Sequence, residues 1–197
     1  MSQSYIEELK GSFYKKYLYI IKKIWVQLLN IILIYFVSLS IFPALAVKVI
    51  QKDKNWFPDD YFIQFFCFLS FNLFATIGNF IAQYFQWPGP KGLIIPCTLR
   101  LLFIPYFLLC NYYPTDNHSE RALTIIFESD VFYVFGVIAL AISSGYTSSL
   151  AMMYIPRCVH PQFSATAGMF GALVIIFGIL AGLNFSLVYP KLASINL

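Results

Sequence analysis

Charged residues are scarce in this chain. Asp, Glu, Lys and Arg make up 11% of its 197 residues, whereas a soluble domain carries roughly 25%. Hydrophobic residues account for 59% and the mean hydropathy is +0.72, which excludes an ordinary soluble domain. The net charge of +4 comes from basic residues scattered among apolar segments, whereas a nucleic-acid-binding protein gathers them on one face. The composition is that of an integral membrane protein.

Histidine and cysteine are also sparse. The chain has 2 histidines, both in polar connections, and 4 cysteines without a C-x-x-C pair, so neither a zinc site nor a disulfide framework is predicted. We expect no metal and no other cofactor. The serines of the apolar segments have no neighbouring histidine or carboxylate in the sequence to activate a nucleophile. An enzyme is therefore not expected.

Long apolar runs are abundant instead. Each is long enough to cross a bilayer as a helix, since a span needs ~20 residues that rise 1.5 Å each. We predict an all-α membrane protein with one bundle of five transmembrane helices over residues 24–189, a polar N-terminal segment over 1–23 and a short tail over 190–197. The predicted spans are residues 24–47, 61–85, 92–110, 131–154 and 162–188.

The second span carries a polar stripe. At ~100° per residue its four members fall within an arc of about 60° on an otherwise apolar helix. They are Asn72, Thr76, Asn79 and Gln83. Amide groups in hydrocarbon must find hydrogen-bond partners, so the stripe is expected to face neighbouring helices or a water-filled cavity. Two interpretations stay open: hydrogen bonding between helices, and the lining of a substrate path.

Proline and arginine interrupt the first and third spans. Pro43 removes a backbone donor in the last third of the first span and is expected to bend that helix. Arg100 lies near the middle of the third span between Pro96 and Pro105, and the spans contain no acidic residue. A cation there costs at least ~2.5 to 3.5 kcal/mol. Arg100 is therefore expected to bond carbonyls freed by the prolines, to bond another chain, or to serve the substrate directly; we assign it and the three prolines a structural role.

Small residues form one face on each of the last two spans. Such faces favour close helix packing, with the lining of a cavity as the second interpretation for the fourth span. On the fourth span the face consists of Ser144, Thr147, Ser148 and Ala151. On the fifth span the helix-packing face consists of Gly168, Gly171, Gly178 and Gly182.

The distribution of charge predicts how the chain is oriented. If the N-terminus is cytosolic, seven basic residues lie inside and five outside, as the positive-inside rule requires. Asn117 begins an Asn-His-Ser sequon for N-glycosylation and falls outside in the same arrangement. We expect a multi-pass protein, in the plasma membrane, with its N-terminus in the cytosol and its C-terminus on the extracellular or lumenal side.

Several short motifs follow one another in a fixed order. They are Ser40-Ile41-Phe42-Pro43-Ala44, Phe71-Asn72-Leu73-Phe74 with Gly78, Trp87-Pro88-Gly89, Arg100, Phe103-Ile104-Pro105, Leu109-Cys110-Asn111, Gly145-Tyr146 and Thr166-Ala167-Gly168. As a set, over about residues 24–189, they resemble the C-terminal half of the equilibrative nucleoside transporters. Any one of them would be weak.

The resemblance implies a fold and an activity. Members of that family have eleven transmembrane helices in an arrangement similar to the major facilitator superfamily, six in one half and five in the other, and this chain looks like the last five. In such folds the substrate sits between the halves, which rock against each other. The resemblance thus implies facilitated movement of nucleosides or nucleobases without cofactor or ATP. The implied partners are the lipid bilayer and an N-terminal half or full-length relative, with no nucleic acid.

The second span departs from the family pattern, which reads FN-x-F-D-x-x-G-R. The acidic and basic positions, which resemble a pair contacting the ribose, are here Ala75 and Asn79. Loss of both leaves no buried charge unpaired, but ribose affinity should fall because charge-assisted hydrogen bonds are about twice as strong as neutral ones. The predicted substrate-binding residues are Asn72, Ala75, Thr76, Asn79, Ser144 and Ser148.

Within this predicted site the residues have separate roles. Thr76 and Asn79 are expected to face a central cavity, and Asn72 to brace the helix against a neighbour. Two hypotheses for the whole chain follow. The first is a facilitative transporter of nucleosides whose N-terminal half is missing here. The alternative is a non-transporting relative that acts as a membrane partner, pairing through the Gly168 to Gly182 face.

Overall fold

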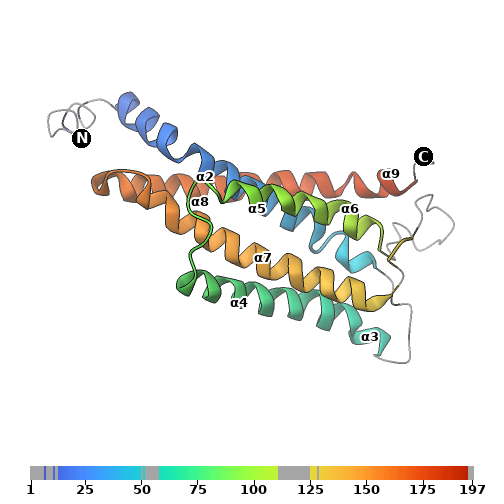
Figure 1. The fold of residues 1–197 in the computed structure, drawn as a ribbon. Helices are drawn as coiled ribbons and strands as arrows, with labels where there is room; N and C mark the ends of the chain where they lie inside the picture. Colours follow the sequence, from blue (N-terminus) through green and yellow to red (C-terminus); the bar gives the residue numbers. More distant parts are fainter. Residues whose placement is uncertain are drawn as a thin grey trace.

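The described chain is helical. The structure, a computed structural model, describes residues 13–49, 58–110, 125–127 and 129–194, together with Glu7, Gly11 and Gln51. Within these ranges the regular elements are all helices, and a bridge between extended residues joins Cys110 to Phe127. The predicted all-α class is confirmed. Figure 1 shows the long helices lying along one another in a bundle.

Within the described residues, four helical segments are long and apolar enough to cross a membrane. The first contains α2 (Phe13–Ile41) and the 3-10 turn η1 (Ala46–Lys48). The second contains the π-helical stretch η2 (Ile63–Leu69) and α4 (Ser70–Tyr84), preceded by α3 (Asp59–Phe62). The third is α7 (Asp130–Arg157). The fourth contains η5 (Pro161–Phe163), α8 (Ser164–Ser186) and the beginning of α9 (Tyr189–Ser194).

A shorter apolar segment occupies the region predicted as the third span. It consists of α5 (Ile94–Leu99), the 3-10 turn η3 (Arg100–Leu102) and α6 (Phe103–Leu108). At 1.5 Å per residue its length is roughly 22 Å, which is less than the ~30 Å of a hydrocarbon core. Pro105 has no N–H to offer the carbonyl of Leu101, and the tighter 3-10 turn forms just before it.

Helix α2 starts earlier and ends earlier than the predicted first span. It begins at Phe13 rather than at residue 24, because buried Ile20 continues the apolar stripe of Ile24 and Ile31 back into the lysine-rich segment. It ends at Ile41. The expectation that Pro43 bends this helix is wrong: Pro43 cannot donate a backbone hydrogen bond, and the chain leaves the helix in a turn before η1.

The long helices pack in pairs and run in two opposite directions. Helix α2 packs along α8, α4 packs along α7, and α7 also contacts α2 and α8. The α4–α7 pair is parallel, since Ala75 meets Gly145 and, one turn later, Asn79 meets Ser149. Helix α7 runs opposite to α2, because Tyr133 near its start bonds the Ala46 carbonyl at the end of the α2 segment. In the described chain α7 is the only long helix that α4 contacts extensively, so α4 lies at the edge of the bundle (Figure 1).

Glycine permits the close approach of α4 and α7. A methyl group on Gly145 would collide with the carbonyl of Ala75, and one on Gly78 would collide with the carbonyl of Ile142. In both places the obstacle is backbone, which a rotamer change cannot move. The two helices therefore touch main chain to main chain along this line.

The glycine face of α8 is used inside the same chain. A methyl group on Gly182 would lie 2.6 Å from the Phe36 carbonyl oxygen of α2, and Gly178 faces Ile32 on the same helix. Gly171 faces Ile155 of α7, whereas Gly168 has open space around it. Three of the four glycines thus pack against α2 and α7, which leaves little of this face for another molecule.

Candidate functional site

The polar stripe of α4 lies to one side of the contact with α7, with Asn79 at the border between them. All four of its side chains are exposed, whereas Gly78 and Ala82 on the side facing α7 are buried. The contact line with α7 and the stripe therefore occupy different sides of the helix. As Figure 1 shows, α4 has no other long helix drawn against its outer side.

Two members of the stripe bond to their own helix. The Asn72 amide Nδ2 donates to the Phe68 carbonyl at 2.8 Å, and the Thr76 hydroxyl donates to the Asn72 carbonyl at 2.8 Å. We expected Asn72 to brace α4 against a neighbouring helix. Its amide bonds its own helix instead. A four-residue step brings each side chain over the preceding turn of backbone, and this local partner replaces the distant one.

Asn79 forms the stripe's hydrogen bond to another helix. Its Oδ1 accepts from the Ser149 hydroxyl of α7 at 2.8 Å, so the amide orientation is set and Nδ2 points its two N–H groups elsewhere. Ala75, one turn earlier, is half-buried beside Gly145. The two positions that replace the family's charged pair thus lie at the border between the α7 contact and the open face.

Ser144 and Ser148 lie on the α2 side of α7. The Ser144 hydroxyl is 2.8 Å from that of Ser38, and Ser148 donates to the Gly145 carbonyl of its own helix at 3.1 Å. Both are half-buried. Neither has a hydrogen bond to the α4 stripe among the described residues, so the structure places the predicted binding residues in two groups.

Arg100 is the centre of the second group. Only 2% of this residue is exposed. Its Nη1 donates to the Leu140 carbonyl at 3.2 Å and to the Ser143 hydroxyl, and its Nη2 donates to the Ser38 hydroxyl at 2.7 Å. One guanidinium thereby joins α2, the α5–α6 segment and α7. The carbonyls freed by Pro96 and Pro105 are not among its partners.

The hydroxyl groups around Arg100 have complementary partners. Ser38 donates to the Ile34 carbonyl at 2.8 Å and accepts from Arg100, which leaves one lone pair for Ser144. Ser143 accepts from Arg100 and donates to the Leu140 carbonyl at 3.0 Å. In the part of the chain that the structure describes, no carboxylate is a partner of the cation. Its Nε is the one guanidinium nitrogen without a hydrogen bond.

This polar layer separates two apolar cores. One cluster of buried side chains includes Ile24 and Leu150, and the other includes Val37 and Tyr133. From its charge we expected Arg100 to need partners inside the bundle. We did not single out Ser38, whose hydroxyl contacts both Arg100 and Ser144. A lone hydroxyl in an apolar span carries little signal, because its role depends on a residue more than sixty positions away.

The remaining predicted sites add little here. Asn117 lies outside the described residues. A cavity between α4, α5 and α7 and a second one between the α5–α6 segment and α7 do not include any stripe residue. Within the described ranges, no group of three or more His, Cys, Asp or Glu side chains is placed to hold a metal ion.

Fold and site together define a multi-pass helical membrane protein with an exposed amide stripe on an edge helix and a buried arginine layer. A sequence model of the nucleoside transporter family matches residues 4–190. Human equilibrative nucleoside transporter 1 is 35% identical over 175 residues, which are 86% of this chain and 37% of that protein. The human equilibrative nucleoside transporter 2 is 30% identical over 175 residues, covering 88% of this chain and 37% of that protein.

A plant protein is also similar: equilibrative nucleotide transporter 1 of Arabidopsis thaliana is 26% identical over 155 residues, 78% of this chain and 31% of its own length. The chain belongs to the nucleoside transporter family, a family of membrane transporters rather than enzymes. It spans little more than a third of the length of the curated relatives it matches.

Proposed function

We propose that this chain forms one wall of a facilitative nucleoside transporter, with the open face of α4 along the solute route. The family match supports the activity, and the names of the human relatives supply the substrate class. The observation that carries the placement is the exposed stripe on α4. Unpaired amide groups are costly in hydrocarbon, so this face requires water, a solute or the rest of the transporter rather than acyl chains.

The mechanism follows from this arrangement. Asn79 keeps two N–H groups for a solute while Ser149 fixes its carbonyl side, and Thr76 keeps lone pairs to accept a hydrogen bond. A neutral nucleoside or nucleobase has complementary donors and acceptors. In transporters built from two bundles, rocking of one against the other exposes the site alternately to each side. The residues here supply binding and no chemical step.

The surface proposed for the alternative, a non-transporting membrane partner, is largely covered by the chain itself. That hypothesis used the glycine face of α8, and Gly171, Gly178 and Gly182 are covered by α7 and α2 of the same chain. The α4 stripe, by contrast, is an exposed polar surface within an apolar span, which suits the lining of a solute route.

The proposal is tested by nucleoside uptake. The part of the human equilibrative nucleoside transporter 1 that precedes the matched segment would be joined to this chain and expressed in cells without nucleoside carriers. Saturable uptake of labelled uridine or adenosine is expected. Thr76→Val should raise KM about three- to tenfold, the equivalent of one hydrogen bond of ~0.5–1.5 kcal/mol.

The matched control is Thr98→Val. Thr98 is also exposed and also bonds its own helix, at the Ile94 carbonyl 2.9 Å away, but it lies on α5. It should leave uptake unchanged. Equal effects of the two substitutions, or no uptake of any nucleoside or nucleobase by a correctly inserted protein, would contradict the proposal.

A double substitution sharpens the same test. Ala75→Asp together with Asn79→Arg restores the family's charged pair at the border of the open face, and should raise uptake because charge-assisted hydrogen bonds are stronger. Either change alone leaves an unpaired charge and should lower uptake. If the double variant and the unsubstituted protein both reach the membrane but the double variant loses uptake, this result would argue against a ribose site at these positions.

A further inference from the structure

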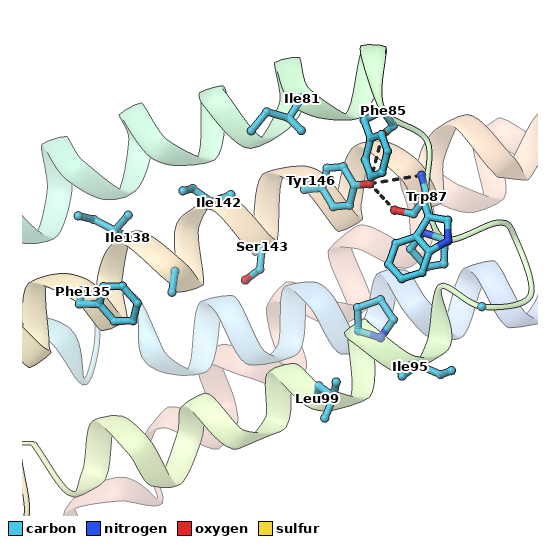
Figure 2. A pocket seen from close by; sticks show the side chains of 14 residues that line it. Ile81, Phe85, Trp87, Ile95, Leu99, Phe135, Ile138, Ile142, Ser143 and Tyr146 are labelled. Carbon is cyan, nitrogen blue, oxygen red and sulfur yellow. Dashed lines mark hydrogen bonds between the residues drawn. The ribbon is translucent and has the colours of Figure 1, made fainter.

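A long apolar groove lies on the other side of α4 from the stripe. It has a volume of about 910 Å³ and runs between α4, α5 and α7. Figure 2 shows Ile81 of α4 and Phe85 just after it on one side, Ile95 and Leu99 of α5 on the other, and α7 residues along the floor from Phe135 to Tyr146. A second cavity of about 450 Å³ continues it toward Tyr106.

One end of the groove, its mouth, is framed by hydrogen bonds. The Tyr146 hydroxyl bonds the carbonyls of Phe85 and Trp87 and accepts the Trp87 N–H, as the dashed lines in Figure 2 show. Tyr154 donates to the Pro88 carbonyl at 3.0 Å, and Gln27 of α2 donates to the Pro90 carbonyl at 2.6 Å. The indole of Trp87 is exposed at this mouth, and tryptophan is the residue enriched at the interface between membrane and water.

Three exposed basic residues belong to the segments that meet at this mouth. Lys91 is exposed and adjoins the groove residue Gly92 in the chain. Arg157 is exposed and holds Gln86 at 2.7 Å. Lys23 lies one helical turn before Gln27 on α2 and is also exposed. A cluster of exposed cations at the level of an interfacial tryptophan complements an anionic membrane surface.

The length of the groove matches one leaflet. From Phe135 to Tyr146 the floor of α7 extends about 17 Å at 1.5 Å per residue, and half of a ~30 Å hydrocarbon core is ~15 Å. We propose that this groove binds an anionic glycerophospholipid, with the headgroup at Lys91 and one acyl chain along α7. This acyl chain would fill the space that separates α4 from the α5–α6 segment.

The test measures lipid binding and is therefore independent of transport. The chain, purified in mild detergent, would be titrated with phosphatidylglycerol and with phosphatidylcholine of identical acyl chains and examined by native mass spectrometry. One phosphatidylglycerol per chain should be retained in preference to phosphatidylcholine. Lys91→Gln should weaken phosphatidylglycerol binding about fivefold, which corresponds to ~1 kcal/mol, and leave phosphatidylcholine binding unchanged.

A matched pair of substitutions locates the lipid. Ala139→Phe places a ring on the floor of the groove and should weaken binding of both lipids tenfold or more. Ala172→Phe makes the same change on the exposed side of α8 and should have no effect. Equal binding by the Ala139→Phe variant and the unsubstituted chain, equal loss in both variants, or displacement of the lipid by an equimolar sterol would overturn the proposal.

A second readout leaves the groove unsubstituted. In a chain with Trp25→Phe and Trp56→Phe, phosphatidylglycerol with brominated acyl chains should quench Trp87 and reach saturation at one lipid per chain. Unbrominated phosphatidylglycerol should restore the fluorescence at a lower concentration than phosphatidylcholine does. Quenching that rises without saturation, or that both lipids reverse equally, would contradict a specific site.

Discussion

At the scale of single residues, Arg100 shows how a membrane bundle holds a cation without an acid. Its two terminal nitrogens are used by hydroxyls and a carbonyl from α2 and α7, and the planar fork of a guanidinium suits partners in two directions. The serines retain other hydrogen bonds of their own. The layer therefore depends on the shape of the side chain as well as on its charge.

Substitution of Arg100 should separate shape from charge. Arg100→Lys keeps the cation but cannot reach Ser38 and Ser143 together, so we expect a loss of ~1–3 kcal/mol from an undersatisfied buried charge. Arg100→Met removes the charge and should cost less than Arg100→Lys, because replacing a buried charge by an apolar group of similar size is often close to neutral. Thermal unfolding in detergent, followed with a dye that reacts with the buried thiols Cys67 and Cys110, measures both. Arg100→Lys as stable as the unsubstituted chain would refute the argument.

At the scale of elements, backbone contact between helices decides the arrangement. The pairs α4–α7 and α2–α8 are each in contact at glycines, so their distance is set by main chain rather than by side-chain size. Helix α4 is attached to the described bundle mainly through this one contact line. The position of the polar stripe consequently depends on Gly78 and Gly145.

A single methyl group should test this dependence. Gly145→Ala forces α4 away from α7 and should destabilise the bundle by ~1–3 kcal/mol, the usual cost of overpacking. The control is Gly168→Ala on α8, which has open space and should be neutral or stabilising by up to ~1 kcal/mol, since alanine favours helix over glycine. Melting temperatures of the two variants in detergent give the comparison. The same melting temperature for both would mean that α4 is held in another way.

At the scale of the whole molecule, the directions of the helices determine at which end of the bundle each segment begins and ends. Helices α2 and α8 run one way and α4 and α7 the other, so the start of α2 and the end of α9 lie at opposite ends of the bundle (Figure 1). The exposed lysines of α2 and Lys91 lie at one end, while Asp130 begins α7 at the other. The cytosolic location of the N-terminus stays a prediction.

Two sequons in the chain test the topology. If the N-terminus is cytosolic, Asn117 lies outside and should be glycosylated, whereas Asn184 lies within α8 and should not be. Expression in eukaryotic cells should yield a band that an endoglycosidase shifts. Asn117→Gln should abolish the shift and Asn184→Gln should leave it. An unsubstituted chain that reaches the membrane but shows no such shift would contradict this assignment.

The sequence by itself determined the class of fold and the make-up of the stripe. Hydrocarbon offers the backbone no hydrogen-bond partner except itself, so long uncharged runs predict helices directly. Helical spacing likewise places Asn72, Thr76 and Asn79 on one side. The sequence did not predict that α2 begins at Phe13 and ends at Ile41. At its start the apolar stripe continues through buried Ile20 despite the nearby lysines, and at its end Pro43 stops the helix despite the apolar residues that follow.

Only the tertiary structure decided which surfaces meet. The Arg100 layer joins Ser38 to Ser143, and three glycines of α8 are covered by the same chain. None of these follows from a local period, because the contacts depend on how helices far apart in the sequence cross. Helix geometry is a property of neighbouring residues, whereas packing is a property of the whole bundle.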